Sequence, residues 1–298
     1  MVQAPDSVEP VIGLEVHVEL ATDTKLFCRC ANRFGDPPNT HVCPVCAGLP
    51  GALPVLSERA IELALRMGLA LGCGANARTK WDRKGYYYPD LPKNYQISQY
   101  DLPLCADGHL DLPAAGGGPP RRIRVRRAHL EEAAGKNTHA AAGHTGVDLN
   151  RAGVPLLEIV SEPDLHGVDD VLAYARALHR LVRWLGASEA NMQMGQMRFE
   201  PNINLHVAAG GRTWRTPICE VKNLNSFRAL ERTVAFEIDR QLAAWREDRD
   251  GFTLETLGKQ NRGYDDAREQ TVFQHEKKEA HDYRYFPDPN LVPVAVDD

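Results

Sequence analysis

The sequence has no hydrophobic run long enough to cross a membrane and no excess of positive charge. Its 298 residues carry a formal net charge of -5 at pH 7, so any contact with nucleic acid must come from a local basic patch. The first ten residues, MVQAPDSVEP, lack the charged start and apolar stretch of a signal peptide. These absences predict a cytoplasmic protein without a membrane-spanning segment, built from one large or two ordinary domains.

The sequence also lacks a P-loop for binding phosphate. Residues 135–137, GKN, match part of that motif. However, no second glycine stands at the required distance, and no Ser or Thr follows Lys136. A nucleotide would therefore have to be held by another architecture.

Four of the seven cysteines gather in one short stretch, as two close pairs joined by a loop: Cys28, Cys30, Cys43 and Cys46. This spacing is typical of a tetrahedral zinc site, in which each pair binds the metal from a turn. A redox pair or free thiols are the alternatives. A cytoplasmic setting disfavours disulfides, and we predict a structural zinc knuckle at residues 26–48.

Alternating strands and amphipathic helices make up much of the chain. Residues 11–20 alternate, which puts Glu15, His17 and Glu19 on one strand face, as a row of metal ligands or as a solvated polar face. Residues 197–207 alternate as well, and Pro201 there suggests an edge strand. Helices are predicted at residues 57–72, 166–186 and 226–245, with N-caps at Ser57 and at Asn225 or Ser226.

Two segments combine features that suit nucleic-acid binding. Residues 81–100 hold five tyrosines and a tryptophan among three cations, which could stack a base or simply pack on the core. Residues 121–127 hold five arginines, several on one face of a predicted strand. That face could contact phosphates, or it could pair with neighbouring acids.

Acidic side chains are concentrated between residues 128 and 164. Glu158 lies inside the apolar run VPLLEIV, where a carboxylate is costly to bury unless a cation or metal holds it. His129 is a candidate ligand nearby. The acids of this segment are Glu131, Glu132, Asp148, Glu158, Glu162 and Asp164.

Several longer motifs, in this order, resemble the GatB/GatE family, the B subunits of aspartyl/glutamyl-tRNA(Asn/Gln) amidotransferases. Some of them run to nine or ten residues, and together they extend over nearly the whole chain. They are IGLEVHVEL (12–20), the cysteine knuckle, GLPG (48–51), RKGYYYPD (83–90), LPKNYQISQY (91–100), HLEE (129–132), PLLEIVSEPD (155–164), KNLNSF (222–227) and DYRYFP (282–287).

The resemblance implies an α+β fold, a cradle with a mixed or antiparallel sheet, packed helices and a small zinc knuckle. It implies that residues 1–295 form the catalytic domain and that helical and tail domains lie outside this chain. The implied activity is that of a carbon–nitrogen ligase. The family uses ATP and Mg²⁺ to phosphorylate the side-chain carboxylate of misacylated Glu-tRNA(Gln) or Asp-tRNA(Asn). Ammonia then displaces phosphate, and it comes from the amidase, the A subunit of a heterotrimer. The C subunit is expected to hold the A and B subunits together.

The resemblance also implies the site residues. Glu15, His17, Glu132 and Glu158 are expected to be catalytic and to gather around Mg²⁺, with Glu131 as a weaker candidate for a second metal. Because Mg²⁺ prefers oxygen ligands, His17 favours Mn²⁺ as an alternative ion or binds through water. Candidate contacts to ATP or the tRNA 3′ end are Lys84, Lys93, Lys136, Arg151, Arg198 and Tyr88, although plain salt bridges are an alternative for the five cations.

Departures from the family pattern bear on the second metal. Ala133 stands where many members carry an acid, Gln193 and Met194 are uncharged, and Glu200 replaces an aspartate. Two other functions are kept open: a zinc-stabilised tRNA-binding module without catalysis, and a metal-dependent phosphohydrolase that uses the same acids.

Overall fold

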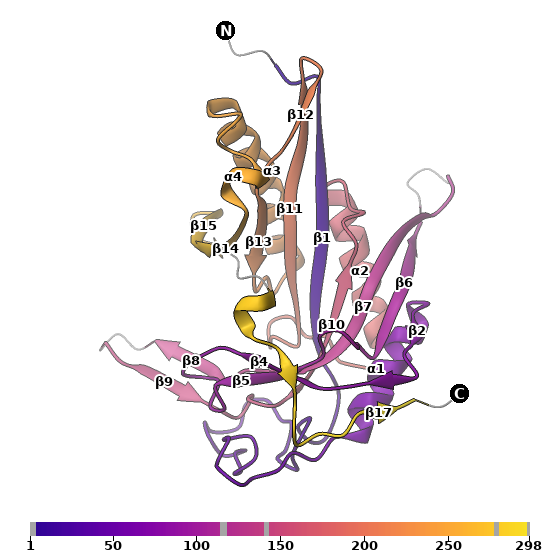
Figure 1. Cartoon of the computed structure of the whole chain (residues 1–298), viewed down its shortest axis with the longest axis vertical. Helices are drawn as coiled ribbons and strands as arrows, with labels where there is room; N and C mark the ends of the chain where they lie inside the picture. Colours follow the sequence, from indigo (N-terminus) through magenta and orange to yellow (C-terminus); the bar gives the residue numbers. More distant parts are fainter. Residues whose placement is uncertain (1–3, 114–117, 140–142, 277–279, 297–298) are drawn as a thin grey trace.

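A ten-stranded sheet is the framework of the chain (Figure 1). The computed structural model describes residues 4–113, 118–139, 143–276 and 280–296. Strands β13 and β14 run parallel, and the other paired strands of this sheet are antiparallel. The strand order is β15 (Gln270–Glu276), β14 (Lys259–Asp265), β13 (Ile218–Lys222), β11 (Met197–Ala209), β1 (Ser7–Glu19), β10 (Pro155–Ser161), β7 (Arg121–Glu132), β6 (Cys105–Leu112) and β2 (Gly74–Ala75), and β12 (Arg212–Arg215) pairs with β11.

One face of this sheet is apolar and carries the core. The alternation in β1 turns Leu14, Val16 and Val18 to this face, where each is at most 1% exposed. Figure 1 shows the three long helices behind the sheet, so the opposite face is left for polar side chains. The helices are α1 (Glu58–Ala70), α2 (Val168–Trp184), α3 (Phe227–Glu247) and the short α4 (Leu254–Leu257).

The predicted helices and their caps are confirmed. The hydroxyl of Ser57 accepts a hydrogen bond from Ala60 N, and that of Ser226 accepts one from Ala229 N. Each bond satisfies one of the free N–H groups of a first helical turn. With the mixed sheet and the four-cysteine cluster, these helices bear out the predicted α+β fold class.

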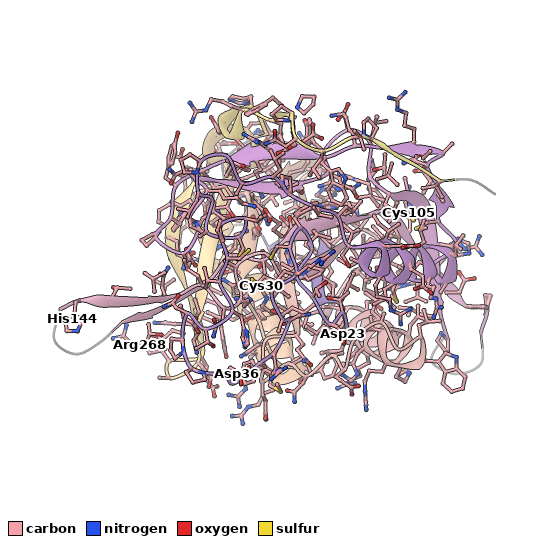
Figure 2. All side chains as sticks on the ribbon, turned by 90° about the horizontal axis from the view of Figure 1, so that it is seen from below. Asp23, Cys30, Asp36, Cys105, His144 and Arg268 are labelled. Carbon is pink, nitrogen blue, oxygen red and sulfur yellow. The ribbon has the colours of Figure 1, made fainter. Side chains whose placement is uncertain are left out.

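Smaller sheets lie beside the polar face in the lower half of Figure 1. The C-terminal segment returns there to pair with strands from the first third of the chain. These elements are β4 (Asp82–Gly85) between β5 (Tyr95–Ser98) and β16 (Phe286–Pro287), β3 (Arg78–Thr79) with β17 (Val294–Ala295), the 3₁₀ turn Ala280–Tyr283, and the hairpin of β8 (Lys136–His139) and β9 (Thr145–Asp148). The hairpin projects from the body of the molecule, with His144 near its tip (Figure 2).

Pro201 lies on an inner strand of the sheet. Pro201 was expected on an edge strand, but β11 lies between β1 and β13. The proline is tolerated because it falls between the Phe199–Leu224 bridge and the Asn202–Glu220 pair, where the β11–β13 ladder is interrupted.

The arginine-rich strand β7 pairs with acids rather than presenting a free basic face. The guanidinium groups of its three alternating arginines make two-bond contacts with single carboxylates: Arg122 with Asp111, Arg124 with Asp164, and Arg126 with Glu162.

In the described part of the chain, no helix is both long and apolar enough to cross a bilayer.

Candidate active site

Three side chains that could bind a metal, from three strands, meet on the polar face of the sheet. His17 on β1 is the register partner of Glu158 on β10, and Glu158 is in turn the partner of His129 on β7. Glu131 lies two residues beyond His129, so its side chain points to the same face. Ligand atoms of His17, Glu131 and Glu158 all lie within 4.8 Å of one another.

The distances and charges within this group suit a cation. His17 Nε2 lies 3.5 Å from Glu131 Oε1 and 3.5 Å from Glu158 Oε2. Burial works to lower the pKa of His17, but the two carboxylates overcome it and raise that pKa to about 10. Burial opposes ionisation of Glu158, yet the neighbouring imidazoles of His129 and His17 hold its pKa well below the usual value. The two acids are therefore ionised. The protonated imidazole of His17 offsets part of their charge, and a metal bound here would displace that proton.

His129 extends the group without adding charge. It is 2% exposed, and its Nε2 lies 3.4 Å from Glu158 Oε2. Burial lowers the pKa of His129 to about 4, so its imidazole is neutral near pH 7. Its place beside Glu158 suits an outer partner that fixes a ligand carboxylate.

Lys84 is a half-buried cation close to this group. Burial works to lower its pKa, but the charges of Tyr285 and Glu131 contribute to a strong rise. Its Nζ also lies 4.9 Å from the ring centre of Tyr283 and 5.8 Å from that of Tyr86. An aromatic wall therefore holds a positive charge next to the two carboxylates.

Glu132 lies outside this group. Because neighbouring residues of a strand point to opposite faces, its carboxylate turns away from Glu131 and meets Lys93, at 2.5 Å from Nζ to Oε1. It also accepts a hydrogen bond from Ile97 N at 3.1 Å. Of the two adjacent glutamates, Glu131 is the one that joins His17 and Glu158.

Glu15 lies in a second acidic group with Glu200 and Glu220, whose carboxylate oxygens are within 4.8 Å of one another. Lys222 is inserted between them, with Nζ 3.1 Å from Glu200 Oε2 and in contact with Glu220. The ammonium group of Lys222 neutralises part of the negative charge of these three glutamates. Sequence reasoning missed Glu220, because only the pairing of β11 with β13 brings it beside β1.

Three of the predicted cations line one cleft. It has a volume of about 830 Å³, and Lys136, Arg151 and Arg198 lie in its wall. Arg151 Nε donates to Glu19 Oε1 at 2.9 Å. The Nε of Arg198 is buried and has no hydrogen-bond partner in the part of the chain that the structure describes. Such a donor suits an anionic ligand.

Tyr88 and the positions that depart from the family pattern have different surroundings. Tyr88 is 56% exposed and packs edge-on against Tyr86. Gln193 and Met194 line the cleft. Ala133 is 2% exposed and packs with Val154 and Leu156, so an acid at that position would enter a small apolar cluster.

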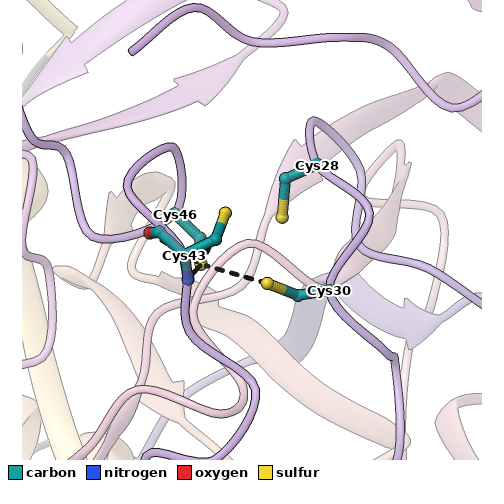
Figure 3. A group of neighbouring side chains, drawn as sticks. All are labelled: Cys28, Cys30, Cys43 and Cys46. Carbon is teal, nitrogen blue, oxygen red and sulfur yellow. Dashed lines mark hydrogen bonds between the residues drawn. The ribbon is translucent and has the colours of Figure 1, made fainter.

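The four knuckle cysteines form a compact group (Figure 3). Cys46 Sγ lies 3.9 Å from Cys30 Sγ and 3.8 Å from Cys43 Sγ. Four sulfurs around zinc at bonds of about 2.3 Å stand about 3.8 Å apart in a tetrahedron. The spacing of the sulfurs therefore fits a tetrahedral metal. Figure 2 places the knuckle, marked by Cys30 and Asp36, on the underside of the molecule.

Comparison with known proteins identifies the family of the chain. A model of the GatB/GatE catalytic domain matches residues 10–298. A relative from Rhodopirellula baltica, named as the B subunit of aspartyl/glutamyl-tRNA(Asn/Gln) amidotransferase, is 55% identical over 292 residues, which cover 97% of this chain and 58% of the relative. Relatives of the same name are 50% identical in Anaeromyxobacter sp. over 292 residues (97% of this chain, 58% of the relative) and in Nitratidesulfovibrio vulgaris over 293 residues (98% and 60%). The chain thus spans about 60% of the length of these relatives, and it belongs to the GatB/GatE family, through the catalytic domain of that family.

Proposed function

We propose that this chain is the catalytic domain of an amidotransferase B subunit and amidates the side-chain carboxylate of glutamate or aspartate attached to tRNA. The observation that carries the proposal is the cluster of His17, Glu131 and Glu158, three metal-competent groups within the segment that matches the catalytic domain. The acceptors would be misacylated Glu-tRNA(Gln) or Asp-tRNA(Asn), in keeping with the names of the relatives.

The chemistry requires activation of a carboxylate. A free carboxylate is a poor acyl donor because its leaving group would be oxide, and phosphorylation by ATP supplies a better one. A divalent metal, when bound, neutralises the charge on the transferring phosphoryl group. His17, Glu131 and Glu158 would hold that metal. An imidazole with two carboxylates suits Mn²⁺ at least as well as Mg²⁺, which prefers oxygen.

His129 and Lys84, beside the cluster, would orient it. His129 Nε2 lies 3.4 Å from Glu158 Oε2, and its buried ring limits the rotation of that carboxylate. Lys84 has a positive charge that lies over the ring of Tyr283. This charge is suited to stabilising a carboxylate or phosphate as negative charge develops. Neither residue has to move or change its charge for this role.

The cleft would receive anionic parts of the substrates. Arg198 and Arg151 offer guanidinium groups, and Lys136 offers an ammonium at the rim. We assign these three to the phosphates of ATP or to the 3′ end of tRNA. Tyr88 is exposed enough to stack a base. Lys93, which is held by Glu132, is not given such a role.

The remaining assignments concern assembly and the knuckle. We propose that residues 1–295 form the catalytic unit. An amidase, the A subunit, would supply ammonia, and a C subunit would hold the A and B subunits together. The complex would work in the cytoplasm. Each relative is named as one subunit of an amidotransferase, which supports a complex of several chains. The knuckle cysteines would hold one structural Zn²⁺.

The test is ATP hydrolysis by the full-length protein together with the A and C subunits. Hydrolysis should rise when Glu-tRNA(Gln) or Asp-tRNA(Asn) is added, and Glu158→Gln should abolish that rise. Glu162→Gln is the matched control, because Glu162 follows the same strand but pairs with Arg126. Hydrolysis indifferent to tRNA would instead indicate a phosphohydrolase, and tRNA binding without turnover would indicate a binding module.

A further inference from the structure

Lys25 is a buried cation between the cysteine knuckle and the wall of the cleft. Its side chain is 0% exposed. Its Nζ donates to three acceptors: His41 O at 2.7 Å, Leu149 O at 3.1 Å and Cys46 Sγ at 3.5 Å. An ammonium has three donors, so these contacts use all of them.

The acceptors of Lys25 differ in charge. Two are neutral carbonyl groups, and the sulfur of Cys46 is the one that becomes anionic as a metal ligand. A buried ammonium is costly unless an anion lies beside it. Zn²⁺ bound by four thiolates carries a net charge of about −2, and that charge is what the ammonium can offset.

The second carbonyl, that of Leu149, lies between Asp148 and Asn150, which line the cleft. Residues 147–150 are joined to residues 37–41 of the knuckle loop by two asparagines. The backbone N–H of Asn39 donates to Asp148 Oδ1 at 3.0 Å, and its side chain bonds to Val147 O and Leu149 N at 2.8–3.0 Å. The side chain of Asn150 bonds to His41 N and Pro37 O at 2.7–2.8 Å. These bonds and the contact with Lys25 attach the segment to the knuckle loop.

The same segment carries cleft residues. Asp148, Asn150 and Arg151 line the cleft on one side, and residues 32–36 and Pro38 of the knuckle loop line it on another. Two parts of the cleft wall are therefore attached to the four cysteines, one directly and one through Lys25 and the two asparagines.

Gly153 packs against Lys25 behind this wall. Its φ of +88° is in the region that favours glycine, and a Cβ there would lie 3.6 Å from Lys25 Cδ and 3.7 Å from Glu132 Oε1. Its carbonyl accepts from Leu26 N at 2.8 Å, and its N–H donates to Ala133 O at 2.8 Å. The chain around Lys25 is thereby fixed to the end of β7.

We propose that Lys25 is an outer partner of the zinc site and couples metal binding to the cleft wall at residues 147–151. The inference rests on the proposed zinc site. Without the metal, the sulfurs lose their common ligand, and the loop that carries Cys46 and His41 is no longer held in place. The contacts of Lys25 with that loop then loosen, and so does the segment that it holds through Leu149. The knuckle therefore does more than stabilise the fold, because its metal sets the position of Arg151.

The experiment compares zinc affinity and hydrogen exchange in wild type, Lys25→Met and Lys25→Arg. Zinc affinity is measured by competition with a chromogenic chelator, and amide exchange is followed by mass spectrometry in peptides that cover residues 147–151. Lys80→Met is the matched control. Lys80 is a half-buried lysine that pairs with Asp82 and Asp101 rather than with the knuckle.

Removal of zinc from wild type should speed exchange at residues 147–151 by about tenfold. Lys25→Met should weaken zinc binding by about 10–100-fold, the usual effect of losing an outer partner, and should speed exchange there even with zinc bound. Lys25→Arg should retain part of the affinity, and Lys80→Met should retain all of it.

Two results would overturn the inference. One is a wild type whose exchange at residues 147–151 does not change when zinc is removed, a readout that holds even if Lys25→Met fails to fold. The other is a folded Lys25→Met that binds zinc as wild type does. A wild type that binds no zinc at all would instead remove the zinc site on which the inference rests.

Discussion

His17 on β1 and Glu158 on β10 are direct partners across an antiparallel strand pair, and His17 Nε2 lies 3.5 Å from Glu158 Oε2. The two residues are far apart in the sequence, and the register of the sheet alone brings them together. Their charges favour each other, and Glu131 completes a three-donor group. This relationship explains why Glu158 can lie in an otherwise apolar strand.

The adjacent glutamates of β7 should behave differently toward metal. Glu131→Gln should weaken Mn²⁺ binding by at least about tenfold, because it removes one of three donors. Glu132→Gln should leave that affinity within about twofold, because its carboxylate is held by Lys93 on the other side of the strand. Titration of Mn²⁺ followed by electron paramagnetic resonance measures both, and equal losses would contradict the assignment of Glu131.

Arg198 should contribute to anion binding in the cleft. Its buried Nε has no partner among the described residues, so an incoming phosphate can satisfy it. A hydrogen bond to a charged group contributes about 1.5–3 kcal/mol, and Arg198→Met should weaken the binding of a non-hydrolysable ATP analogue at least about tenfold in calorimetry. Arg59→Met, on the exposed face of α1, is the control; an unchanged affinity in Arg198→Met would remove this residue from the site.

The knuckle should contain metal. Elemental analysis should find about one Zn per chain, and Cys43→Ser should lower that content and the melting temperature, because binding free energy at such a site adds to folding. For a chain of this size each kcal/mol corresponds to roughly 2–4 °C. Cys73→Ala, at a buried thiol outside the knuckle, should keep its zinc. A zinc-free protein with unchanged stability in Cys43→Ser would refute the site.

A buried acid away from the site should govern part of the acid stability. Glu237 is fully buried; burial opposes its ionisation, but Arg240, 2.7 Å away, holds its pKa below the usual 4.5. A depressed folded pKa gives stability that is present above pH 4.5 and lost as pH falls through the folded value.

Glu237→Gln should therefore lower the free energy of unfolding at pH 7 by about 3 kcal/mol, the usual cost of breaking a buried pair. The difference from wild type should shrink below pH 4.5. Urea unfolding at pH 7 and pH 3.5 measures it. Glu247→Gln, at the exposed end of the same helix, should change neither value; a difference for Glu237→Gln that grows in acid would contradict the sign.

Periodicity was enough to predict the elements that frame the site. The alternation of β1 predicted that Glu15 and His17 share a face, and the helical spacing at α2 and α3 predicted packed helices, because these patterns depend on local geometry. The position of Glu158 in an apolar run predicted a need for a nearby cation or metal, since that argument depends only on burial.

Pairing between distant segments could not be predicted in the same way. Whether Glu131 or Glu132 faces His17 depends on the register of β7 with β10, and a shift of one residue would exchange them. The partners of Arg124 and Arg126 lie 36–40 residues away. The sequence alone therefore cannot distinguish a free basic strand face from one whose arginines pair with acids. Glu220 and Lys222 join Glu15 only through two successive strand pairings.

The central claim is that His17, Glu131 and Glu158 hold the metal of the catalytic domain. A crystal structure with Mn²⁺ and a non-hydrolysable ATP analogue, with the ion located by its anomalous signal, tests it directly. We expect one Mn²⁺ bonded to His17 Nε2 and to carboxylate oxygens of Glu131 and Glu158, with the phosphates of the analogue reaching toward it. An ion bound only among Glu15, Glu200 and Glu220, or nucleotide bound with no ion at the first group, would contradict the account.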